Sequence, residues 1–109
     1  MKFNSEFCGR IIQVTEALDF GDAVSNQVIA LDRLFKRLGF NSAIFSKWHH
    51  EKVAEHRQDL DELDAGEGDI VILHFYGFSQ FALPAVLKRY TTRVMVYHNI
   101  TPEKYFELT

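Results

Sequence analysis

Ile11-Ile12-Gln13-Val14-Thr15 and Ile70-Val71-Ile72-Leu73 are the stretches that decide the fold. Both are short, rich in β-branched residues and apolar with little alternation. Such runs are typical of parallel strands that are covered on both faces. Val94-Met95-Val96-Tyr97 is a third run of this kind, and Ser42-Ala43-Ile44-Phe45 is a shorter strand between the first two. We therefore expect a parallel sheet of four strands.

The strongest helical pattern lies between the first and second strands. Apolar residues recur there along one helical stripe: Val24, Val28, Leu31, Phe35 and Leu38. Asp22 or Ser25 can cap the start of this helix, and Gly39 suits a left-handed residue after its end. The charged residues are assigned to the opposite, solvent-facing side: Asp32, Arg33, Lys36 and Arg37.

The remaining segments are less regular. Residues 49–68 are polar and predict a loop with a weak helix at about 60–64. A second helix is expected within 79–90, starting near Ala82 because its proline is tolerated in a first turn. Residues 101–107 predict a one-turn helix. The order β-α-β-(α)-β-α-β predicts an α/β fold with a parallel sheet and right-handed crossovers.

Length and composition exclude several classes of protein. The 109 residues suffice for one domain, and 47% hydrophobic with 14% aromatic residues excludes disorder. A net charge of −3 provides no electrostatic footprint for nucleic acid. Cys8 is the single cysteine, and no Cys/His cluster indicates zinc. Neither a signal peptide nor a membrane-spanning apolar run is recognisable, so we expect a cytoplasmic domain without metal or other cofactor.

Parallel sheets bind ligands at the carboxyl ends of their strands, which directs attention to residues 16–26, 74–79 and 98–105. Gly21, Asp22 and Ala23 form the turn into the first helix, where free N–H groups can meet a phosphate. A plain turn capped by Asp22 is the alternative. The loop has neither the GxGxxG nor the Walker pattern, so nicotinamide and P-loop chemistry lack their fingerprints.

His74 and His98 each end a buried strand. A neutral imidazole donates and accepts a hydrogen bond at once, which suits sugar hydroxyls, whereas packed, hydrogen-bonded core histidines are the alternative. No third ligand is spaced to complete a metal site with them. Tyr76, in an aromatic turn, is a candidate wall for a sugar ring or a contact with another domain, with core packing as the alternative. Three further histidines are assigned to solvent: His49, His50 and His56.

Three segments resemble family 4 glycosyltransferases. Phe20-Gly21-Asp22-Ala23-Val24-Ser25-Asn26 looks like the family's YGDAISN loop. Asp69-Ile70-Val71-Ile72-Leu73-His74-Phe75 is similar to its DVLIYHY strand. Tyr97-His98-Asn99-Ile100-Thr101-Pro102-Glu103-Lys104-Tyr105-Phe106 resembles its YHNITPPEFF segment, which is the most specific of the three. The resemblance covers about residues 10–107.

The resemblance implies the GT-B architecture, in which two Rossmann-like domains face each other across a cleft. It implies a three-layer α/β/α domain whose four predicted strands lie in the order 2-1-3-4. The implied reaction is a retaining, metal-independent transfer of a sugar from a nucleotide-sugar donor to an acceptor. Residues 1–109 would form part of the N-terminal, acceptor-side domain, and the donor-binding C-terminal domain is missing, so we expect this chain alone to be inactive.

Site residues follow from the same resemblance. Gly21, Asp22 and Ala23 would face the donor phosphate and sugar, and His98 would line the site of the transferred sugar as the catalytic residue. Asn99, Thr101 and Tyr105 would flank the acceptor. His74 and Tyr76, considered above for their own chemistry, complete the acceptor-binding candidates.

Two further expectations concern partners and an alternative class. The surface that the missing half would cover, including an edge of the fourth strand, favours self-association. The alternative is a non-catalytic flavodoxin-like or receiver-like module that binds a ligand or a protein. A phosphate-accepting receiver needs adjacent acids after its first strand and an Asp ending the third; here Glu16 and Asp19 are separated and His74 ends the strand.

Overall fold

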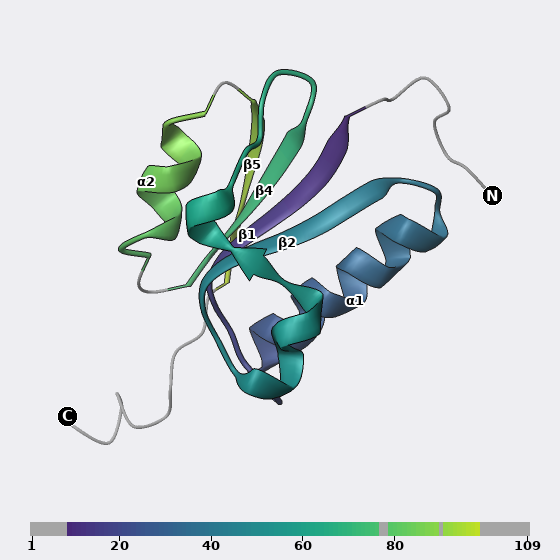
Figure 1. Cartoon of the computed structure of the whole chain (residues 1–109), viewed down its shortest axis with the longest axis vertical. Coiled ribbons are helices and arrows are strands. Elements are labelled where there is room, and N and C mark those ends of the chain that lie inside the picture. Colours follow the sequence, from purple (N-terminus) through teal and green to yellow (C-terminus); the bar gives the residue numbers. More distant parts are fainter. Residues whose placement is uncertain (1–8, 77–78, 90, 99–109) are drawn as a thin grey trace.

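The computed structural model describes residues 9–76, 79–89 and 91–98 (Figure 1). Strands and helices alternate along this part of the chain: β1 (Arg10–Leu18), α1 (Ala23–Arg37), β2 (Asn41–His49), η1 (Glu51–His56), β3 (Gln58–Asp59), η2 (Leu60–Glu62), β4 (Ile70–Phe75), α2 (Ala82–Leu87) and β5 (Thr92–Tyr97). The expected α/β class is confirmed. No helix within these residues is long and apolar enough to cross a bilayer.

The five strands form one parallel sheet in the order β3-β2-β1-β4-β5. The expectation of four strands in the order 2-1-3-4 is therefore wrong in count and order. The four predicted runs are neighbours as β2, β1, β4 and β5, but the two-residue strand β3 adds an edge beside β2. Gln58–Asp59 was missed because it is polar and too short to show a periodic pattern. The observed order is that of the first five strands of a Rossmann sheet.

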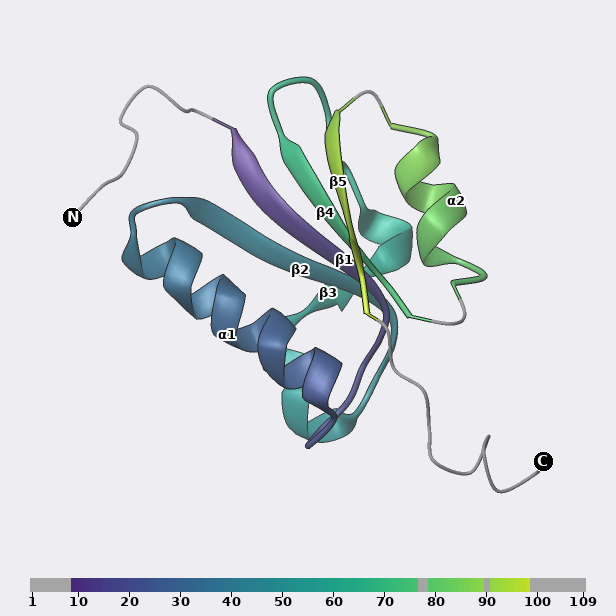
Figure 2. The same cartoon turned by 180° about the vertical axis from the view of Figure 1, so that it is seen from behind.

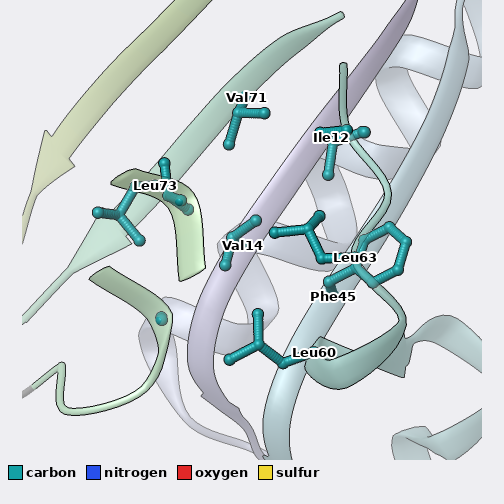
Figure 3. Packing of buried hydrophobic residues seen from close by; sticks show 10 residues of the cluster. Ile12, Val14, Phe45, Leu60, Leu63, Val71 and Leu73 are labelled. Atoms are coloured by element: carbon teal, nitrogen blue, oxygen red, sulfur yellow. The ribbon is translucent and has the colours of Figure 1, made fainter. Parts of the chain in front are cut away.

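The sheet separates two hydrophobic clusters, which makes the domain three-layered (Figures 1 and 2). On one face, strand residues pack with η2 and α2, as Figure 3 shows for Ile12, Val14, Phe45, Leu60 and Leu63. On the other face, α1 packs on the cluster Leu18, Val24, Val28, Ile44 and Val53. Because side chains alternate along a strand, these apolar runs supply both clusters at once.

Helix α1 begins and ends where its sequence predicts. The Asp22 carboxylate accepts a hydrogen bond from Val24 N–H at 3.1 Å. At the other end Gly39 adopts a φ of 94°, and its N–H and that of Phe40 bond back to Lys36 O and Phe35 O at 3.1 and 2.9 Å. This is the paired arrangement of a Schellman cap.

The buried face of α1 differs from the predicted stripe. Leu31, Phe35 and Leu38 are only half-buried, whereas Asp32 is 3% exposed rather than solvent-facing. Val24, Val28 and Asp32, at intervals of four residues, lie toward the sheet instead. Asp32 is tolerated there because its carboxylate accepts from Ser42 Oγ at 2.6 Å and pairs with Lys36 Nζ at 2.8 Å.

The polar segment 49–68 folds back onto the sheet through a few apolar residues. The predicted weak helix at 60–64 is a short 3₁₀ turn, Leu60–Glu62, and Leu60, Leu63 and Ala65 are buried. Helix α2 begins at Ala82 as expected but spans six residues only. The one-turn helix expected at 101–107 lies outside the described residues.

Candidate functional site

The candidate site lies at the carboxyl edge of β1, β4 and β5. The chain leaves β1 for β2 on one side of the sheet and β4 for β5 on the other, so the strand order reverses between β1 and β4. Open α/β sheets bind ligands outside such a reversal. Thr15 pairs with His74, which pairs with Val96, so β4 and β5 end together one residue beyond this row, while β1 continues for three. The structure therefore brings the three candidate segments, as far as it describes them, to one edge.

A direct contact joins the two strand-end histidines. His74 Nδ1 lies 2.9 Å from His98 Nε2, and the two rings lie edge to edge and nearly coplanar, with centroids 5.1 Å apart. On its other side His74 Nε2 lies 2.8 Å from Gln13 Oε1. Gln13 Nε2 in turn donates to the backbone carbonyl of Val28 in α1 at 2.9 Å. The four groups form one continuous hydrogen-bonded chain from α1 to His98.

The inner part of this chain is closed to solvent. Gln13 is 0% and His74 1% exposed, while His98 is half-buried at the edge. Burial lowers the pKa of His74, and the neighbouring His98 lowers it further, to about 4. His74 is therefore neutral at pH 7. The acceptor-binding role of His74 stays a prediction. Because His74 is buried behind His98, a ligand at this edge would reach His98 first.

Tyr76 borders the pair from the end of β4. Its hydroxyl donates to Ala17 O and accepts from Ala17 N–H, both at 3.2 Å, and accepts from Thr15 Oγ1 at 3.4 Å. Its ring meets His98 edge-on, with centroids 6.5 Å apart. Burial raises the pKa of Tyr76, as does the carboxylate of Asp22. The hydroxyl is thus engaged with β1, and the ring is the part of Tyr76 that borders His98.

The glycine loop, residues 19–23, is a turn into α1 that is capped by the negatively charged carboxylate of Asp22. Gly21 has a φ of 83°, which strains other residues, although a Cβ there would meet nothing within 4 Å. Besides capping Val24 N–H, Asp22 accepts from Ser25 Oγ at 3.3 Å. Ser25 Oγ in turn accepts from Asp19 N–H at 2.8 Å. The Asp22 carboxylate thus occupies the start of α1, beside exposed Ala23, and this favours ligand hydroxyls over a phosphate at the loop.

Two residues of this edge were missed from the sequence. Gln13 is the link between α1 and His74, and Glu16, 5% exposed, caps α2. The Glu16 carboxylate accepts from Phe81 N–H at 3.1 Å and from Ala82 N–H at 2.9 Å. The available signal was polarity: both residues interrupt or follow an apolar strand that is covered on both faces.

The remaining predicted site residues, the possibility of a metal site and the surface hollows complete the description of the site. Asn99, Thr101 and Tyr105 lie outside the described residues. Among the residues that the structure describes, no group of three His, Cys, Asp or Glu side chains could hold a metal ion. A hollow of about 330 Å³ lies beside the glycine loop between α1 and η1, lined in part by Phe20, Asn26 and Lys52. A larger one of about 410 Å³ lies at the opposite end of the sheet, where β5 begins.

Comparison of the chain with protein-family models, curated proteins and solved structures found no match.

Proposed function

We propose that this chain is the N-terminal, acceptor-side part of a retaining family 4 glycosyltransferase of GT-B architecture. Such an enzyme moves a sugar from a nucleotide-sugar donor to an acceptor. The observation that carries the proposal is the 2.9 Å contact between His74 and His98. Each belongs to a different segment that resembles the family, so residues singled out by resemblance meet at the edge where parallel sheets bind ligands.

The chemistry of the edge suits the acceptor side of such a reaction. Retaining transfer needs an acceptor hydroxyl held against the sugar carbon and fixed donors for the leaving diphosphate. The described residues offer an imidazole, an aromatic ring and carboxylates, which bind hydroxyls and rings. Asp19 and Asp22 oppose a diphosphate at this loop, so we assign the main diphosphate contacts to a second domain and expect no turnover by this chain alone.

The decisive test is the gene sequence beyond the codon for Thr109. The proposal expects an open reading frame that encodes a second Rossmann-like domain. Transfer from a nucleotide-sugar by that longer protein, and none by the 109-residue chain, is the matching biochemical result. A stop codon in place of that frame, or turnover by the chain alone, would contradict the proposal.

In the protein that carries both domains, His98→Ala is expected to lower kcat by at least about tenfold, the effect of losing one hydrogen bond of about 1.5 kcal/mol in the transition state. Steady-state kinetics and a thermal unfolding curve together separate this loss from a loss of folding. His49→Ala is the matched control, because His49 is exposed at the end of β2 and takes no part in the histidine pair. Equal rates for wild type and His98→Ala would remove His98 from the site.

A non-catalytic binding module remains the second candidate, because Asp22 already caps the start of α1 and no phosphate cradle is formed by the described loop. Its topology would be Rossmann-like and not flavodoxin-like, since the order β3-β2-β1-β4-β5 differs from the flavodoxin order 2-1-3-4-5. This module needs no donor domain. It predicts no transfer by the longer protein, and ligand binding at the His98 edge that is unchanged when the downstream sequence is removed.

The partner part of the proposal is self-association through the edge strand β5. Within the described residues β5 pairs with β4 alone, and Val94, Met95 and Tyr97 are 45%, 56% and 64% exposed. A six-residue edge strand whose last four residues are Val, Met, Val and Tyr is a ready template for a further strand, whereas the opposite edge is the short polar β3.

Sedimentation of the chain is therefore expected to show a concentration-dependent dimer. Met95→Lys should shift it toward the monomer, because a charged edge residue opposes strand pairing. Leu34→Lys, at an exposed position of α1, is the control and should leave the dimer intact. A strict monomer at high concentration would contradict this prediction.

A further inference from the structure

The donor and the acceptor of each hydrogen bond in the chain from Val28 to His98 can be assigned, starting from the backbone carbonyl of Val28. The Val28 carbonyl can only accept, so the Gln13 side chain must present its NH₂ to it. Turning the amide around would place Gln13 Oε1 against the carbonyl oxygen of Val28, with no proton between them. Gln13 Oε1 therefore faces His74, and it too can only accept.

The protons of both imidazoles follow from this starting point. Because Gln13 Oε1 accepts, His74 Nε2 carries the proton. A neutral His74 then has its lone pair on Nδ1, the atom that faces His98 Nε2 at 2.9 Å. His98 Nε2 must carry a proton to complete this contact. In neutral His98, Nδ1 is left as the acceptor, and it makes no hydrogen bond within the described part of the chain.

We propose that Gln13 and His74 are positioning residues that fix His98 as the Nε2–H tautomer, so that Nδ1 of neutral His98 accepts a hydrogen bond from a ligand hydroxyl. The same atom becomes a donor to an anion only when His98 is protonated. The inference deepens the proposed function, on which its choice of a sugar hydroxyl rests. The tautomer itself is a property of this chain and needs no enzyme activity.

The surroundings of His98 are consistent with this role. His74 lies edge to edge with His98, with an angle of 23° between the ring planes, and Tyr76 meets the His98 ring edge-on at 77°. The carboxylates of Asp19 and Asp22 act on the neighbouring Tyr76. Both would disfavour a bound anion at this end of the sheet, which adds to the preference for a hydroxyl.

Long-range nitrogen–proton NMR of the histidine rings tests the tautomer directly in the 109-residue chain. At a pH where His98 is neutral, we expect one fixed Nε2–H tautomer for both His74 and His98. Exposed His49 and His50 are internal references from the same spectrum. A His98 ring with its proton on Nδ1 would overturn the inference.

Two variants test whether Gln13 and His74 cause this state. In Gln13→Leu, His74 Nε2 loses its acceptor, so neither imidazole is held in one tautomer. His98 is then expected to exchange between its two tautomers. Should that variant not fold, Gln13→Leu/His74→Leu removes both buried polar partners together, and His98 should exchange between tautomers. A folded variant of either kind that retains the wild-type His98 tautomer would overturn the inference.

Titration with a methyl glycoside and with inorganic phosphate tests the ligand part. The glycoside is expected to shift the His98 signals while the ring is neutral, and phosphate only after the same spectra show it protonated. Phosphate bound to neutral His98 in preference to the glycoside would overturn the hydroxyl preference. Absence of glycosyl transfer by the longer protein, with the tautomer as expected, would reject the proposed function and leave the tautomer assignment standing.

Discussion

Phe45→Ala is expected to lower the free energy of unfolding by about 3–5 kcal/mol, the usual cost of removing a buried phenyl ring. Phe45 lies on β2, is 1% exposed and belongs to the same buried cluster as Leu60 and Leu63 (Figure 3). The loss would be a large share of the roughly 5–15 kcal/mol that stabilises a typical domain. Urea denaturation followed by circular dichroism measures it.

Leu31→Ala is the matched control for this experiment. The sequence pattern places Leu31 in the core, and by that reasoning its replacement would cost about 2–5 kcal/mol. In the structure Leu31 is only half-buried, so the expected loss is well below that of Phe45→Ala. Equal losses for the two variants would show that Leu31 belongs to the core, as the sequence pattern predicts, and would contradict the observed face of α1, which buries Asp32 more deeply than Leu31.

Acidification from about pH 6.5 to about pH 4 is expected to lower the stability through His74 by up to about 3 kcal/mol. Burial holds the pKa of His74 at about 4 in the folded state, against 6.5 ordinarily. Within this window the unfolded chain binds a proton at His74 that the folded chain does not, so stability falls as pH falls. Above the window His74 is neutral in both states and contributes no pH dependence.

Urea denaturation at several pH values measures this effect against a background of other titrating groups. Gln13→Leu/His74→Leu is the control, because it keeps those groups and removes His74 alone among the titratable side chains. The difference in slope between the two proteins isolates the contribution of His74. Parallel pH profiles would mean that His74 is not held neutral by burial.

Local patterns were sufficient for the regular elements. Three runs rich in β-branched residues and the shorter stretch 42–45 predicted the four long strands, and Asp22 and Gly39 marked the ends of α1, because caps and periodicity depend on neighbours in sequence. The gathering of residues at one edge was also foreseeable, since parallel strands that are joined by crossovers present their carboxyl ends together.

The errors share a different cause. Asp32 was assigned to solvent by its charge, yet Ser42, ten residues further along the chain, supplies its hydrogen bond. Strand β3 exists only because β2 offers an edge to two polar residues. Gln13 and Glu16 carry no motif, and their partners, His74 and the start of α2, lie 61 and 66 residues away along the chain.

The sequence by itself determined the alternation of strands and helices, the boundaries of α1 and the edge of the sheet on which chemistry-bearing residues gather. Periodicity and capping act between residues a few positions apart, so they can be read along the chain. Only the tertiary structure decided which buried polar groups meet. The contacts of His74 with Gln13 and His98 depend on the register of β1, β4 and β5 and on the position of α1 against the sheet. That register is set by the packing of the whole domain.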